Sequence, residues 1–253
     1  MPKPDAPFLS LPHEGGICLS MIVKDEQDVI ARCLRSVRPH IQSWCIVDTG
    51  SADNTEACAH DALKGIPGSF HHRGQDNFAN MRNGAWDLAL GHDPAYLMFL
   101  DADEELAIPG RIGTLEHDAY LIRVHHCGLI SERYWLVRGD YPNRWEGRIH
   151  EDVAPHGAIA RIPDTFIVSH LDGARAKDLQ ARNESDLRQL LLATQEEPEN
   201  PRYWYYLGAT YHLMGRRDKA LAAFKRRVSM ITHDDEMYRR SEHFIRIYGG
   251  VTV

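Results

Sequence analysis

The chain has 253 residues, enough for one large domain or for a domain with a smaller appendage. Its composition, 43% apolar and 26% charged, is that of an ordinary globular protein, so neither a disordered nor a fibrous structure is expected. The formal net charge of −7 argues against a general nucleic-acid-binding protein.

The first hundred residues alternate between strand and helix patterns. Residues 17–23 form a compact β-rich run, apolar side chains recur at helical spacing over residues 29–37, and residues 44–47 form a second strand-like run. A helical stripe over residues 77–90 then leads to the apolar run 96–100. Such alternation predicts an α/β fold with a mostly parallel central sheet that is covered on both faces.

The pattern changes after residue 105. Short β-like pieces occupy residues 119–124, 134–137 and 166–169, and from about residue 174 the chain has a helical pattern. The charge changes as well, because residues 1–173 carry 15 basic and 25 acidic side chains whereas the remainder carries 14 and 11. We therefore predict a catalytic domain over residues 1–172 and an α-helical tail over residues 173–253.

The tail contains one copy of a repeat-like pattern, and its helices are expected to break at residues 198–201, at Gly215 and at residues 233–235. The tetratricopeptide consensus is matched at Trp204, Leu207, Gly208, Tyr211, Gly215, Ala220 and Phe224. A single copy does not form a free-standing solenoid, so the pair is expected to pack on the catalytic domain or on another chain. An unrelated helical hairpin is the alternative.

Four carboxylates follow the apolar run 96–100 within five residues, at Asp101, Asp103, Glu104 and Glu105. In an extended backbone Asp101 and Asp103 point the same way, so both can face one hard divalent cation such as Mg²⁺ or Mn²⁺. The carboxyl ends of strands are also where open α/β sheets bind ligands. The alternative is a solvated turn in which Asp103 caps a helix that begins with the two glutamates.

Three further polar side chains are predicted at the same edge of the sheet. Asp48 ends the second strand-like run, Glu26 follows the first, and Arg82 lies near the start of the helix over residues 77–90. A carboxylate there can accept hydrogen bonds from a base or ribose, and an arginine near a helix start favours an anion. A capped turn and an ordinary surface arginine are the alternatives.

Taken together, these segments resemble a known family. Residues 19–26, 47–53, 78–83 and 99–104 are similar, in order and spacing, to the family 2 glycosyltransferases with the GT-A fold. The most similar branch joins that domain to a tetratricopeptide-like tail and includes peptide S-glycosyltransferases. The resemblance extends over about residues 17–230.

The resemblance implies a nucleotide-sugar donor, most often UDP-linked, and a bound Mn²⁺ or Mg²⁺ ion. It implies a nucleoside site formed by Val23, Glu26, Asp48 and Arg82. It also implies that Asp101 and Asp103 approach the ribose, the metal and the diphosphate, and that His170 near the end of the domain meets the metal or the diphosphate.

Residues 145–151 resemble a second signature of the same branch. An inverting transfer needs a carboxylate to take the proton of the acceptor, and Glu151 is the predicted catalytic base alongside Asp103 on the metal side. Asp152 is the alternative base, and a plain surface acid is the other interpretation. The segment is not a zinc-protease motif, because Ala154 stands where HExxH requires histidine.

Two departures from the family pattern affect the predicted function. Asp25 stands where the family usually has asparagine, which adds a negative charge near the expected nucleotide. The QxxRW motif of processive synthases is absent. Transfer of a single sugar is therefore expected rather than synthesis of a polymer.

Two other functions remain as alternatives. A sugar-phosphate nucleotidyltransferase shares the α/β layout, but it usually has a glycine-rich basic loop after the first strand, and residues 24–26 contain no glycine and two acids. A non-catalytic tetratricopeptide-like binding module with an inert α/β domain is the second. The acceptor is left open among peptides, lipids and saccharides, and a homo-oligomer through the tail is a further candidate.

The expected location is the cytoplasm. No apolar stretch reaches the roughly 20 residues of a membrane helix, and residues 1–16 lack the features of a signal peptide. The cysteines are odd in number, widely spaced and free of a CxxC pair, which favours reduced thiols. They are Cys18, Cys33, Cys45, Cys58 and Cys127.

Overall fold

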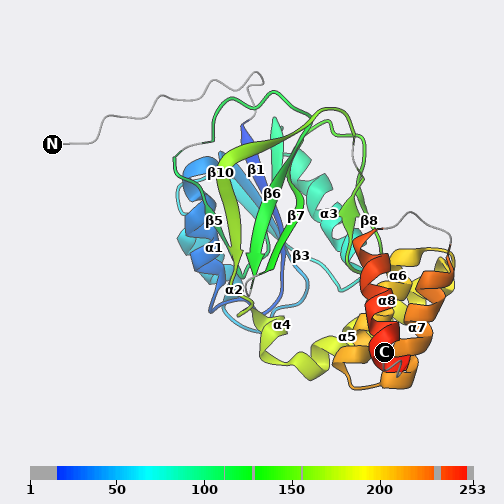
Figure 1. Ribbon diagram of the computed structural model, residues 1–253. Helices are drawn as coiled ribbons and strands as arrows, with labels where there is room; N and C mark the ends of the chain where they lie inside the picture. Colours follow the sequence, from blue (N-terminus) through cyan, green and yellow to red (C-terminus); the bar gives the residue numbers. More distant parts are fainter. Residues whose placement is uncertain (1–15, 111, 127–128, 155, 231–234, 250–253) are drawn as a thin grey trace. The chain divides into compact units, whose positions relative to one another are not determined.

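The computed structural model describes residues 16–110, 112–126, 129–154, 156–230 and 235–249 (Figure 1). The strands are β1 (Ile17–Val23), β2 (Ser43–Asp48), β3 (Gly68–His72), β4 (Tyr96–Phe99), β5 (Glu104–Ala107), β6 (Ala119–His126), β7 (Leu129–Arg138), β8 (Trp145–Glu146), β9 (Asp152–Val153) and β10 (Ile159–Ser169). The helices are α1 (Ile30–Val37), the short 3-10 helix η1 (Arg38–His40), α2 (Thr55–Ala62), α3 (Phe78–Leu90), α4 (Ala174–Lys177), α5 (Leu179–Glu196), α6 (Pro201–Leu213), α7 (Arg217–Ser229) and α8 (Glu236–Gly249).

The described residues form two compact units. One contains the sheet and extends to Lys177, except for Gly147–His150. The other contains Gly147–His150 and the chain from Asp178 onward. The predicted boundary after residue 172 stays a prediction.

The first unit is built on an eight-stranded sheet in the order β3-β2-β1-β4-β7-β6-β10-β5. Strands β3, β2, β1 and β4 are mutually parallel, whereas β7 is antiparallel to both β4 and β6. Strand β10 runs parallel to β6 and pairs antiparallel with β5. The mixed α/β architecture confirms the predicted fold class.

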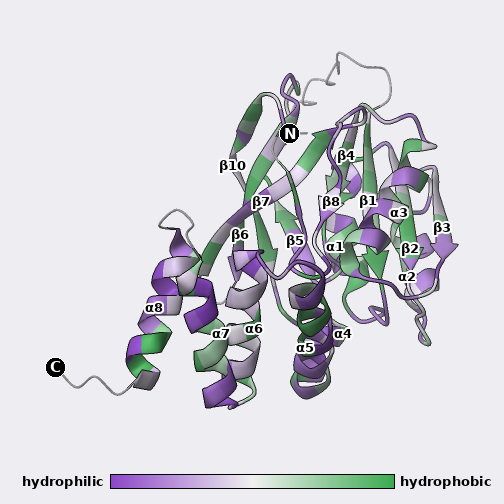
Figure 2. Cartoon of the chain, turned by 90° about the vertical axis from the view of Figure 1, so that its right-hand side faces the viewer, coloured by the Kyte–Doolittle hydropathy of each residue, from purple (hydrophilic) through white to green (hydrophobic). Residues whose placement is uncertain are grey.

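Two apolar cores cover the two faces of this sheet. Helices α1 and α2 pack on one face around Leu34 and Trp135, and α3 packs on the other around Trp86 and Phe99. Strands β1 and β2 are buried along nearly their whole length and are coloured hydrophobic in Figure 2. Their continuous apolar runs follow from burial on both faces, as expected of parallel strands.

Residues Glu104–Ala107 form strand β5, not the capped helix that was the alternative for the acidic segment. The buried side chains in this strand alternate, with Glu104 and Leu106 turned inward. Pairing with β10 fixes that register, since Glu104 lies opposite Ser169.

The second unit consists of the helices α5 to α8 and the segment Gly147–His150. Helices α6 and α7 meet at Gly215, as predicted, where the backbone has a φ of +70° that favours glycine. The rings of Phe224 and Phe244 stack at 4.8 Å and join α7 to α8. The expected break at residues 233–235 lies partly outside the described residues, with α8 starting at Glu236.

None of the helices in the described parts of the chain is both long and apolar enough to span a lipid bilayer. The four cysteines within those parts, Cys18, Cys33, Cys45 and Cys58, are free thiols. Cys127 lies outside the described residues.

The contact between α6 and α7 yields a stability prediction. A Cβ atom at Gly208 would lie 2.6 Å from the ring of Phe224, so we expect Gly208→Val to destabilise the helical unit by about 1–3 kcal/mol through overpacking. Thermal unfolding followed by circular dichroism measures the effect. The control is Gly74→Ala, where no atom lies within 4 Å of the added Cβ. Equal midpoints for the two variants would contradict the tight packing.

Candidate active site

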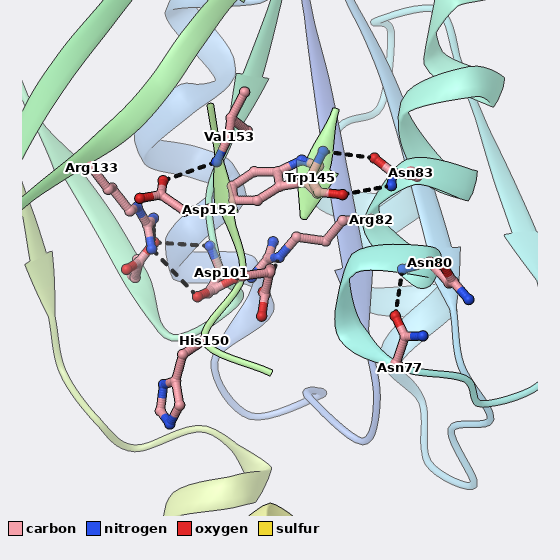
Figure 3. Close-up of polar contacts among 12 residues, drawn as sticks. Asn77, Asn80, Arg82, Asn83, Asp101, Arg133, Trp145, His150, Asp152 and Val153 are labelled. Atoms are coloured by element: carbon pink, nitrogen blue, oxygen red, sulfur yellow. Dashed lines mark hydrogen bonds and ion pairs between the residues drawn. The ribbon is translucent and has the colours of Figure 1, made fainter. Parts of the chain in front are cut away.

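Two arginines from different elements hold Asp101 at the end of β4. Nη2 of Arg82, from α3, lies 2.7 Å from Oδ1 of Asp101, and Nη1 of Arg133, from β7, lies 3.5 Å from Oδ2 (Figure 3). Burial by itself would raise the pKa of Asp101, but the two guanidinium charges outweigh it and hold this pKa well below its usual range. Asp101 is therefore a fixed anion whose two oxygens both face cations.

Arg82 also reaches the predicted base. Its Nε lies 2.6 Å from Oε1 of Glu151, whose side chain is 10% exposed. One side chain of α3 thus connects the carboxylate at the end of β4 with the carboxylate before β9. Among the described residues Oε1 is the oxygen of Glu151 that accepts a hydrogen bond, which leaves Oε2 for another partner.

The neighbouring asparagine fixes the segment that carries Glu151. Asn83 donates from Nδ2 to the carbonyl of Trp145 and accepts from the backbone N–H of Trp145, both at 2.9 Å (Figure 3). The guanidinium of Arg82 lies 5.0 Å from the centre of the Trp145 ring, within the range of a cation–π contact. The predicted segments 78–83 and 145–151 are therefore joined to each other by both polar and aromatic contacts.

Arg133 is a site residue that the sequence analysis missed. Besides Asp101 it pairs with the buried carboxylate of Glu104, which also accepts a hydrogen bond of 2.9 Å from the backbone N–H of Asp101. Burial raises the pKa of Glu104, and the charge of Arg133 opposes that rise. In the sequence, Arg133 is only a charged residue directly before the strand-like run 134–137. That position does not indicate which carboxylates it pairs with.

Asp103 and Glu26 lie on either side of a close approach of the backbone. A Cβ atom added at Gly173 would be 2.9 Å from Oε2 of Glu26 and 3.2 Å from Cβ of Asp103. Burial, together with the charges of Asp103 and Asp101, raises the pKa of Glu26 to about 7, although a hydrogen bond from the N–H of Ala174 opposes it. Burial and the charge of Asp101 likewise raise the pKa of Asp103.

The negative charge around Glu26 and Asp103 therefore exceeds the positive charge of the adjacent arginines. A divalent cation would relieve that excess, and Mg²⁺ is usually held by one or two carboxylates together with substrate phosphates. In the parts of the chain that the structure describes, no three His, Cys, Asp or Glu side chains converge as in a metal centre. The residues fit an ion that Asp103 holds with a phosphate-bearing ligand, not a metal site formed by protein alone.

The side chain of His170 contacts Glu105, not Asp101 or Asp103, the carboxylates that it was predicted to join at a metal. Its Nε2 lies 3.0 Å from Oε2 of Glu105, while its backbone N–H donates to the carbonyl of Asp103 at 3.1 Å. The predicted metal ligands thus adjoin one another through the backbone but do not aim at one point. The assignment of His170 stays a prediction.

The predicted nucleoside residues Asp48 and Val23 shape the loops after β2 and β1. Oδ1 of Asp48 accepts hydrogen bonds from the backbone N–H groups of Gly50 and Ser51, at 2.9 and 2.8 Å, and from the hydroxyl of Ser51. The carbonyl of Val23 accepts from the N–H of Thr49 at 2.9 Å. Asp48 therefore holds a turn, as in the alternative interpretation, and any role in binding a nucleoside stays a prediction.

Asp25 connects these two loops. Its backbone conformation and hydrogen bonds explain why an aspartate is accepted where the family usually has asparagine. It has a φ of +55°, a conformation that asparagine and aspartate adopt more readily than other residues with a side chain. Its Oδ1 accepts from the N–H of Ala52 at 2.7 Å, and its own N–H donates to the hydroxyl of Ser51 at 2.8 Å. An aspartate thus meets the backbone requirement of this position.

The sequence model described as Glycosyl transferase family 2 matches residues 18–148, just over half of the chain. The SPbeta prophage-derived glycosyltransferase SunS of Bacillus subtilis is 21% identical over 248 residues, covering 90% of this chain and 56% of that protein. A TPR repeat-containing protein of Synechococcus elongatus is 38% identical over 92 residues, covering 36% of this chain and 21% of that protein.

Among solved structures, the crystal structure of S. aureus TarS superposes with a TM-score of 0.52 at 11% identity, covering 91% of this chain and 50% of that chain. At this identity the likeness concerns the fold alone. The chain spans from about a fifth to just over half of the length of the curated relatives it matches.

The Glu104–Arg133 pair yields a prediction about stability. Arg133→Met leaves the buried Glu104 carboxylate without its cation, so we expect a loss of about 3 kcal/mol in the free energy of unfolding. Adding Glu104→Gln should recover part of that loss, because the uncompensated charge is then absent. Urea unfolding measures both variants, with Arg35→Met on the exposed side of α1 as the control. A single variant as stable as the control would contradict this account.

Proposed function

The chain belongs to glycosyl transferase family 2, and on that premise we propose that it is a metal-dependent, inverting glycosyltransferase. It moves a single sugar from a nucleotide sugar, UDP-linked, to an acceptor. The observation that supports the proposal most is a pair of salt bridges from Arg82, one to Asp101 and one to Glu151. Asp103 lies two positions after Asp101 in the sequence. These salt bridges support a reaction centre in which Asp101 is on the donor side and Glu151 is the base, at one edge of the sheet.

On the donor side, Asp103 would hold Mn²⁺ or Mg²⁺ together with the diphosphate. The ion would supply Lewis acidity that neutralises the negative charge on the departing nucleoside diphosphate. Asp101 is fixed by Arg82 and Arg133. It would face the ribose end of the donor, and Glu26, Val23 and Asp48 would border the nucleoside.

On the acceptor side, Glu151 is the base. Its Oε2 takes the proton of the acceptor as the acceptor atom bonds to the anomeric carbon and the bond from that carbon to the phosphate oxygen breaks. Arg82 holds the other oxygen of Glu151, so the orientation of the base depends on the residue that also fixes Asp101. Displacement from the opposite face inverts the anomeric configuration.

We further propose that α6 and α7 form a tetratricopeptide-like hairpin that binds the acceptor or a second copy of the chain. The close packing of Gly208 on Phe224 and the predicted turn at Gly215 support this proposal. The buried cysteines of the protein, Cys18, Cys33 and Cys45, are free thiols. Free thiols favour the reducing cytoplasm as the location of the protein.

The donor side is tested with Asp103→Asn. We expect Mn²⁺-dependent hydrolysis of the preferred UDP-sugar to fall by about 100-fold, because charge on the leaving group is no longer neutralised. A coupled assay of released UDP gives the rate, and circular dichroism checks the fold. The control is Asp61→Asn, at an exposed position on α2. Hydrolysis by Asp103→Asn at the control rate would refute the metal assignment.

The base is tested with Glu151→Gln and, separately, Asp152→Asn. General-base catalysis contributes about 10² to 10⁴ in rate, so Glu151→Gln should lose at least about 100-fold in sugar transfer while still binding UDP. Asp152→Asn and the control Glu146→Gln should stay near the wild-type rate. Calorimetry with UDP and Mn²⁺ separates binding from chemistry. A larger loss in Asp152→Asn than in Glu151→Gln would move the role of base to Asp152.

A further inference from the structure

Strand β10 has a large bulge beside β6. Arg161 pairs with Leu121 and Phe166 pairs with Arg123, so β10 advances five positions where β6 advances two. Residues 162–165 leave the ladder opposite the single residue Ile122. Asp164 among them has a left-handed φ of +53°. Bulges of this kind interrupt backbone pairing and often lie next to functional sites, where they redirect side chains.

The bulge borders a half-open cavity of about 370 Å³. The residues that line the cavity come from β6, β7 and β10, which are neighbouring strands of the sheet (Figure 1). Leu121 and Ile162 contribute apolar walls, and Arg123, Glu132, Arg161 and Thr165 contribute polar groups. Its size suits a small organic group, not a single water molecule.

The charges in the cavity do not balance. Arg161 forms two hydrogen bonds to Glu132, of 2.8 Å from Nε and 2.7 Å from Nη2, so these two side chains neutralise each other. Arg123 has no hydrogen bond or ion pair with any residue that the structure describes. It is an exposed guanidinium at the wall of a cavity, in a chain of net charge −7. Arg123 acts electrostatically on Glu132 as well, but the cavity is lined by two arginines and one glutamate, so a net positive charge lies next to apolar surface.

Along the direction of the strands, the cavity lies at the same height as the proposed reaction centre. Arg123 lies opposite Glu132 in the β6–β7 ladder, and the next residue, Arg133, pairs with Asp101. From β4 to β6 is two strand spacings, or about 10 Å. Leu121 at the cavity wall lies opposite Tyr134, whose pKa is raised by burial and by the nearby Asp152 carboxylate. Leu121 packs against the apolar core that contains Tyr134 and Val153, two positions after Glu151, whereas Ile162 packs against the core on the other face of the sheet.

We propose that this cavity binds an anionic group, a carboxylate or a phosphate with a small apolar part attached, through Arg123. On the proposed function, from which this role follows, the group belongs to the acceptor and lies two strand spacings across the sheet from β4. The guanidinium can bind two oxygens of the anion at once, and the Leu121 and Ile162 side chains contact its apolar part. The acceptor is thereby an acidic molecule, not a neutral saccharide.

Binding is tested on the full chain by methyl NMR. Leucine and isoleucine methyl groups are labelled, and Leu121 and Ile162 report the cavity. The probes are benzoate, phenyl phosphate and the uncharged benzyl alcohol, each added with the donor site saturated by UDP and Mn²⁺. We expect both anions to shift the two reporter signals and benzyl alcohol to bind more weakly. A stronger response to one anion identifies whether the carboxylate or the phosphate is preferred.

Two variants change the charge of the cavity in opposite directions. Arg123→Gln should weaken anion binding about five-fold, the size expected of one exposed charge. Glu132→Gln frees Arg161 and should strengthen binding. Arg35→Gln, at an exposed position of α1 that does not line the cavity, should leave it unchanged. Unshifted reporter signals, equal binding of benzyl alcohol, or equal affinities in all three variants would overturn the proposal.

Hydrolysis of the UDP-sugar by the wild-type protein is measured separately. Absent hydrolysis with intact anion binding would refute the proposed function and, with it, the acceptor role of the cavity. Hydrolysis without anion binding would refute the cavity assignment alone.

Discussion

Two partly buried arginines, Arg82 and Arg133, compensate three carboxylates where β4 ends, and the placement of the proposed reaction centre depends on that compensation. Arg82 comes from α3 and Arg133 from β7, so the ion pairs join elements on both sides of Asp101. Removal of either cation would leave a carboxylate in a partly dry environment, which proteins tolerate poorly. The same contacts that stabilise this edge of the sheet therefore set the distance between the donor side and Glu151.

The remaining negative charge has a different role. Within the described parts of the chain, neither Glu26 nor Asp103 forms an ion pair with an arginine, and the backbone at Gly173 passes so close that a larger residue would disturb both. Burial and the charges of Asp103 and Asp101 raise the pKa of Glu26, and burial and the charge of Asp101 raise that of Asp103. A cation that arrives with a diphosphate would relieve this repulsion. Protein groups alone thus fix Asp101 and Glu151, whereas Asp103 is the carboxylate that we propose to interact with the donor and its metal.

Local sequence patterns predict the elements that are buried, since a strand covered on both faces must be apolar throughout. The run 17–23 accordingly matches β1, and the alternation up to residue 100 matches the order of α1, β2, α3 and β4. No such pattern marks the edge strand β3, which is half exposed. Local sequence patterns also cannot predict the pairing of Arg82 with Glu151, because the two residues are 69 positions apart in the chain. The β10 bulge, and hence the cavity, depends on register between strands, which side-chain periodicity does not encode.

The central claim is that this edge of the sheet binds a nucleoside diphosphate through a metal held by Asp103. A crystal structure with UDP and Mn²⁺, recorded near the manganese absorption edge, would locate both the ion and the nucleotide. We expect an anomalous peak within about 2.3 Å of a carboxylate oxygen of Asp103, in contact with the diphosphate, and the uridine over the loops after β1 and β2. A manganese peak away from Asp103, or a uridine bound on another part of the chain, would contradict it.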